Sequence, residues 1–136
     1  MSWIRNAARG VLGGFLIFAG SAHLTFARDT FRAQVPDWVP LDVDFVVVSS
    51  GVVEIVLGVA LLVLYRHQVA MGWIVAAFFV AVFPGNISQY VTHTDAFGLD
   101  TDTARLIRLF FQPVLIAWAL WCTGALSALR GRTATR

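Results

Sequence analysis

The chain is poor in charge and in cysteine. Only 13% of its 136 residues are charged, whereas soluble domains carry about 25%. It contains no lysine, so all ten basic residues are arginine, and Glu54 is the single glutamate. One cysteine, Cys122, excludes an internal disulfide framework and a CxxC redox pair. The arginines are spread among loops and ends, so the pI near 9.3 does not indicate a nucleic-acid partner.

Apolar residues, by contrast, make up 58% of the chain and gather in four long runs. These runs predict membrane spans over residues 9–27, 43–65, 69–90 and 105–127. Each run is close to the roughly 20 apolar residues that a helix needs to cross a bilayer, and none alternates as a β-barrel strand would. We therefore expect an all-α protein, a four-helix transmembrane bundle that forms a single domain over residues 1–136.

The arginines also predict the orientation of the bundle. The termini and the middle loop contain no acidic residue and hold Arg5, Arg9, Arg66, Arg130, Arg132 and Arg136. The other two loops hold all seven aspartates. An even number of spans and this arginine bias place both termini in the cytoplasm. A cleaved signal peptide is disfavoured, because apolar sequence continues through Phe26 and its removal would leave an odd number of spans.

The first loop has a pattern of its own over about residues 29–40. Pro36 ends a predicted short helix, and residues 37–40 (DWVP) form a rigid extended turn. We expect a segment that lies on the outer membrane surface with Phe31, Val35 and Trp38 buried. An ordinary ordered loop is the alternative.

Five polar residues lie inside the apolar runs, where polar groups are costly. They are His23, Glu54, Asn86, Arg108 and Gln112. At a rise of roughly 1.5 Å per residue, Glu54 lies near mid-membrane and the other four lie in the outer half. Residues from separate spans thus share one layer, which predicts a polar site open toward the extracytoplasmic side.

Helical spacing predicts that this layer faces the bundle interior. Gly51, Glu54 and Gly58 follow one face of the second span, and small residues mark close approach between membrane helices. Gly10 and Gly14 form a GxxxG pair on the first span, which is also typical of close contact.

Each polar residue has a functional and a structural interpretation. Glu54 is a candidate proton donor or acceptor, or else a structural salt-bridge partner of Arg108. Arg108 is a candidate substrate clamp. The remaining three, His23, Asn86 and Gln112, are candidate substrate-binding groups or interhelical hydrogen bonds. No His, Cys or Asp cluster has metal-ligand spacing, no nucleotide motif is present, and haem is disfavoured because only His23 lies inside a span.

Five segments in order along the chain carry a resemblance to a known family. They are residues 20–24 (GSAHL), 31–40 (FRAQVPDWVP), 50–54 (SGVVE) with Gly58, 82–86 (VFPGN) and 108–112 (RLFFQ) with Trp118. The chain resembles the DoxX family of small bacterial membrane proteins over nearly its whole length. Gly85 departs from the alanine expected there.

The resemblance implies a multi-pass protein of the bacterial inner (plasma) membrane and a redox-associated role, linked to quinones or thiols. Quinone is then the expected ligand, with no covalently bound cofactor and with a soluble or membrane redox partner. In that reading His23, Asn86 and Gln112 hydrogen-bond the ring and Glu54 exchanges its proton. The alternative is a non-enzymatic assembly, lipid-binding or small-molecule-binding protein. A homo-oligomer is compatible with both.

Overall fold

A computed structural model describes residues 3–25, 35–36, 38–91 and 101–134. In these ranges the chain forms five α-helices and one short 3-10 helix, without strands. The elements are α1 (Trp3–Leu24), α3 (Val43–Val63), η1 (Tyr65–His67), α4 (Gln68–Val91), α5 (Asp102–Cys122) and α6 (Ala125–Ala134).

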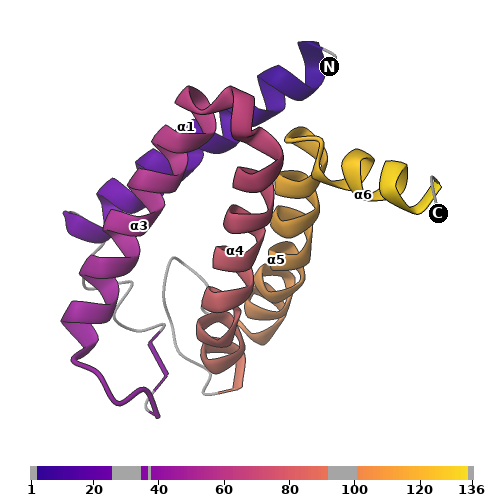
Figure 1. Cartoon of the computed structure of the whole chain (residues 1–136). Coiled ribbons are helices and arrows are strands. Elements are labelled where there is room, and N and C mark those ends of the chain that lie inside the picture. Colours follow the sequence, from indigo (N-terminus) through magenta and orange to yellow (C-terminus); the bar gives the residue numbers. More distant parts are fainter. Residues whose placement is uncertain (1–2, 26–34, 37, 92–100, 135–136) are drawn as a thin grey trace.

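The predicted all-α fold is confirmed, and four of the described helices are long and apolar enough to cross a membrane, as expected of a membrane protein. Helix α1 packs against α3, and α4 packs against α5 (Figure 1). The two pairs approach each other at the end that carries η1 and α6, and they spread apart toward the opposite end. The buried core lies between the pairs and includes Leu16, Leu61, Val75, Phe79 and Leu115. Large apolar side chains such as Phe18 and Phe110 remain exposed on the outer faces, where acyl chains would contact them.

Glycines control how closely α1 and α3 pack. A Cβ added to Gly20 would lie 2.5 Å from the carbonyl oxygen of Gly51, and a Cβ added to Gly58 would lie 2.6 Å from that of Gly13. Each helix therefore contributes two glycines, seven residues apart, to an antiparallel contact of backbone on backbone. This contact places Glu54, between Gly51 and Gly58, against α1, as the spacing predicted.

The other glycine prediction was wrong. Cβ atoms added to Gly10 and Gly14 would have nothing within 4 Å. These residues lie on α1 one helical turn apart, but the face that α1 presents to α3 contains Gly13 and Gly20 instead. The GxxxG spacing identified a helix face without side chains. It could not identify which such face of α1 packs against another helix.

Local capping explains where two of the spans begin. The Asp42 carboxylate accepts hydrogen bonds from the backbone N–H groups of Asp44 and Phe45, which starts α3. The Thr101 hydroxyl accepts from the N–H of Ala104, 3.1 Å away, and starts α5. Helix α4 continues through Pro84 to Val91.

The fourth span ends earlier than the predicted residue 127. Helix α5 stops at Cys122, and Gly124 adopts a φ of 79°, a left-handed conformation that favours glycine. The chain then turns and continues as α6, which leaves the axis of α5 (Figure 1). This last helix extends to Ala134.

Replacing Gly124 with alanine is expected to lower the free energy of unfolding by about 1–2 kcal/mol, because a Cβ is strained in the left-handed region. Gly131→Ala is the control, since its Cβ would meet nothing within 4 Å inside α6. Equilibrium unfolding in mixed micelles measures both variants. Equal stability of the two variants would contradict the role of Gly124 as the turn residue.

The surface segment predicted over residues 29–40 is described only in part. Residues 29–34, including Phe31, and residue 37 lie outside the described ranges. Val35 is partly buried and Pro36 is buried, whereas Trp38 is 72% exposed. The chain itself therefore does not bury Trp38, and its predicted burial at the membrane surface stays a prediction. Its indole lies at the edge of a pocket, where an amphipathic ring can keep one side in contact with the surroundings.

Candidate functional site

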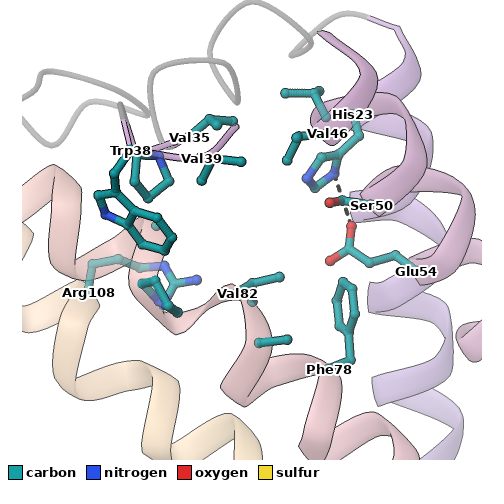
Figure 2. Close-up of a pocket in the computed structure, with 15 residues that line it drawn as sticks. His23, Val35, Trp38, Val39, Val46, Ser50, Glu54, Phe78, Val82 and Arg108 are labelled. Carbon is teal, nitrogen blue, oxygen red and sulfur yellow. Dashed lines mark ion pairs between the residues drawn. The ribbon is translucent and has the colours of Figure 1, made fainter. Parts of the chain in front are cut away.

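A pocket of about 240 Å³ opens between the two helix pairs, at the end where they spread apart. All four membrane-length helices and the segment after residue 34 contribute to its wall. Apolar side chains cover most of the wall: Val35, Pro36, Trp38, Val39, Val46, Val47, Phe78, Ala81, Val82 and Pro84. The polar side chains in the wall are His23, Ser50, Glu54 and Arg108. Figure 2 shows His23 and Glu54 on one side of the pocket and Arg108 on the other.

The acidic side of the pocket is a buried carboxyl beside an imidazole. His23 Nδ1 lies 3.0 Å from Glu54 Oε2, and both side chains are almost entirely buried. The same nitrogen lies 2.8 Å from the carbonyl oxygen of Ala19, one turn earlier in α1. A carbonyl oxygen only accepts hydrogen bonds, so Nδ1 carries a hydrogen and directs it to Ala19. Glu54 Oε2 consequently receives no hydrogen bond from the described residues, although the imidazole is within ion-pair distance.

The glycine contact positions this pair. His23 follows Gly20 by one turn, and a Cβ added to Gly51 would lie 2.7 Å from the Cβ of His23. The missing side chain of Gly51 thus provides the space that the His23 side chain occupies between α1 and α3. Glu54 follows Gly51 by one turn on the same face of α3 and meets the ring from below. Any side chain at position 51 would displace the imidazole.

The basic side of the pocket is held by a hydrogen-bond chain from α5 to α4. Arg108 Nη1 donates to Gln112 Oε1 over 3.0 Å, and Gln112 Nε2 donates to the carbonyl oxygen of Phe79 over 2.7 Å. Gln112 is only 1% exposed. The Arg108 guanidinium also lies 5.8 Å from the centre of the Phe111 ring. The chain of bonds fixes the guanidinium on its wall and leaves its other donors for the pocket.

The structure brings three of the five predicted site residues into the pocket wall: His23, Glu54 and Arg108. Gln112 lies behind Arg108 and is occupied by its hydrogen bonds to Arg108 and Phe79. Asn86 belongs to α4, but its side chain lies outside the described part of the structure; Pro84 and Gly85, just before it, line the pocket.

The salt bridge that was the structural alternative for Glu54 has a different partner. No ion pair within 4.0 Å joins Glu54 to Arg108 in the described ranges, and the two side chains reach into the pocket from opposite walls (Figure 2). His23 takes the position beside Glu54. Helical depth alone could not distinguish these partners, because His23 and Arg108 were both expected in the same layer.

Ser50 and Phe78 were not predicted for the site. Ser50 precedes Glu54 by four residues, so it lies one turn above it on the same face of α3, and this spacing was available as a signal. Phe78 belongs to an apolar run and had no distinguishing feature. The single thiol, Cys122, is fully buried in the core at the other end of α5 and does not line the pocket.

The comparisons with known proteins place the chain in a family. No curated protein and no solved structure matches it. The family model that matches is Domain of unknown function (DUF8561), over residues 12–123. The resemblance to the DoxX family is therefore wrong: short segments such as GSAHL and VFPGN consist mainly of small and apolar residues that many membrane bundles use, so their order was less specific than expected. The match covers most of the chain, from α1 to the end of α5, and the protein belongs to the DUF8561 family.

Proposed function

We propose that the protein binds one small amphiphilic molecule within the membrane and exchanges a proton with it at Glu54 and His23. The observation that carries this proposal is a mainly apolar pocket with an acid–imidazole pair on one wall and a guanidinium on the facing wall. A ligand in the pocket would contact apolar side chains along its body and polar groups at its head. A buried carboxyl next to a histidine is a suitable site for proton transfer.

The proposal includes an orientation in the membrane. Arginines at the termini and in the middle loop favour a cytoplasmic location for both ends of the chain. The pocket opens at the opposite end of the helices, which is then the outer half of the bilayer.

A quinone was expected from the resemblance to DoxX, which the family match overturns, so quinone binding now rests on the pocket alone: the two carbonyl oxygens of a quinone could accept hydrogen bonds from the two facing walls. Reduction of a quinone also needs electrons. Cys122 is buried away from the pocket, so a redox role requires a soluble or membrane-bound partner that supplies them. The non-enzymatic alternative, binding of a lipid or a small molecule without electron transfer, is favoured by this separation of the thiol from the pocket.

Filling the pocket is expected to remove ligand binding. Val82→Trp places an indole in the pocket wall. The control is Val80→Trp, two residues earlier on α4, because Val80 is 56% exposed and does not line the pocket. Each variant is purified from native membranes, and bound small molecules are extracted and identified by mass spectrometry. We expect about one amphiphile per chain in the wild type and in Val80→Trp, and at least a tenfold loss in Val82→Trp.

A short-chain quinone added to the emptied protein tests the ligand class, with thermal stability in micelles as the measurement. Glu54→Gln keeps the size of the side chain and removes the ionisable proton, so it should bind the quinone headgroup without exchanging a proton.

Equal ligand content in the two tryptophan variants would show that the pocket is not the binding site.

A further inference from the structure

The ionisable groups that face the pocket can be counted wall by wall. Helix α1 contributes His23, α3 contributes Glu54 and α5 contributes Arg108; the lining residues from α4 and from residues 35–39 that the structure describes are not ionisable. Arg105, one turn before Arg108, lies outside the pocket wall and is paired with Asp102 at 2.8 Å. The charge of the pocket within the described ranges therefore depends on three side chains.

Arg108 is the fixed charge among them, because a guanidinium stays protonated in proteins. Its hydrogen-bond partner, Gln112, is neutral. When Glu54 is ionised and His23 is neutral, the carboxylate balances the guanidinium across the pocket. When one proton is added to the Glu54–His23 pair, that pair becomes neutral overall, and none of the described pocket-lining residues then balances the positive charge of Arg108 in a mainly apolar pocket. Such a charge is costly unless an anion joins it.

We infer that the pocket binds an anion and a proton together, so that its ligand is an apolar weak acid, a carboxylate in the simplest case. The inference rests on the proposed function, and it narrows the ligand class from any amphiphile to an acidic one. The carboxylate accepts hydrogen bonds from the free donors of Arg108, and the proton is held by Glu54 and His23. No covalent bond forms or breaks.

The geometry favours an anion over a neutral head for a second reason. Gln112 holds one nitrogen of the guanidinium and leaves the others, so a carboxylate can form the paired hydrogen bonds that suit this fork. A neutral carbonyl ligand presents a single oxygen to the fork and carries no charge, so it leaves the charge of Arg108 unbalanced. By reciprocity, an anion that favours proton uptake must itself bind more tightly when the proton is present.

Benzoate and benzamide are the probes, because they share size and shape and differ in charge. Binding is measured by calorimetry on the purified protein in lipid nanodiscs, and proton uptake is measured in weak buffer with a pH indicator, with empty nanodiscs as the reference. We expect benzoate to bind at least tenfold more tightly than benzamide and to carry about one proton per chain. Its affinity should rise as the pH falls, by up to about tenfold per pH unit.

Three variants separate the two charges. Arg108→Gln should remove the preference for benzoate over benzamide. Arg108→Lys keeps the positive charge and should retain most of this preference, and it serves as the test if Arg108→Gln does not fold. Glu54→Gln imitates the protonated acid. It should bind benzoate with little proton uptake and with an affinity that varies less than twofold with pH.

The outcomes distinguish the inference from the function on which it rests. Equal affinity for benzoate and benzamide, or benzoate binding without proton uptake in the wild type, overturns the inference and leaves amphiphile binding intact. A short-chain quinone that binds while benzoate does not has the same meaning. If none of the three probes binds, and no molecule co-purifies, the inference and the proposed function both fail.

Discussion

A leucine at position 20 is expected to separate α1 from α3 and to abolish the folded state. Even a single Cβ at this position would lie 2.5 Å from the backbone oxygen of Gly51 and 2.7 Å from a side-chain carbon of Ile55. Backbone cannot move aside as a flexible side chain can, so the helices themselves must part. Alanine at position 20 should lower the free energy of unfolding by about 1–3 kcal/mol, the usual range for overpacking. The loss caused by leucine should be larger than the whole free energy of unfolding of the bundle.

The matched control is leucine at position 14, on the same helix, where an added Cβ meets nothing within 4 Å. Yield of folded protein by size-exclusion chromatography and unfolding in mixed micelles measure both variants. Gly14→Leu should be as stable as the wild type to within about 0.5 kcal/mol. A folded Gly20→Leu protein with wild-type stability would contradict the helix pairing that positions His23 and Glu54.

Replacing His23 with leucine is expected to lower the free energy of unfolding by about 1–3 kcal/mol, because Glu54 then loses the only ionisable group within 4.0 Å in the described part of the chain. The carboxyl is buried, and its Oε2 already lacks a hydrogen bond there. Glu54→Gln combined with His23→Leu should lose less than the sum of the two single variants, because the double variant contains no unpaired carboxyl.

His67 supplies the control for this cycle, since it is exposed in η1 and lies outside the pocket. His67→Leu should change stability by less than about 0.5 kcal/mol. The four proteins of the cycle are unfolded in the same micelles at the same pH. Additive effects of the His23 and Glu54 substitutions would mean that the 3.0 Å contact contributes nothing to folding.

The layer that contains the site could be predicted from the sequence, because the rise of a helix is constant. Counting residues from the ends of the apolar runs put His23, Glu54 and Arg108 at related depths, and the structure brings these three to one pocket. The i, i+3, i+7 spacing of Gly51, Glu54 and Gly58 also predicted the face of α3 that packs inward. Both predictions use only the geometry of one helix at a time.

The partners within that layer could not be predicted in the same way. Gln112 had two interpretations, a ligand contact or an interhelical hydrogen bond, and the structure shows the second, since it donates to the carbonyl oxygen of Phe79 on α4 and accepts from Arg108. The predicted salt-bridge partner of Glu54 was Arg108, but Glu54 lies beside His23. Each outcome depends on how one helix is rotated and placed against another, which no single helix encodes.

The sequence by itself determined how many helices are long and apolar enough to cross a membrane and which polar groups lie inside them, because water-to-lipid transfer depends on composition and not on neighbours. Only the tertiary structure decided that α1 pairs with α3 through Gly20 and Gly51, that α5 ends at Cys122 before the turn at Gly124, and that the charged groups line two facing walls. The physical reason is that close packing is a property of two surfaces together. Gly10 and Gly20 are both glycines of α1, but only Gly20 lies against the backbone of another helix.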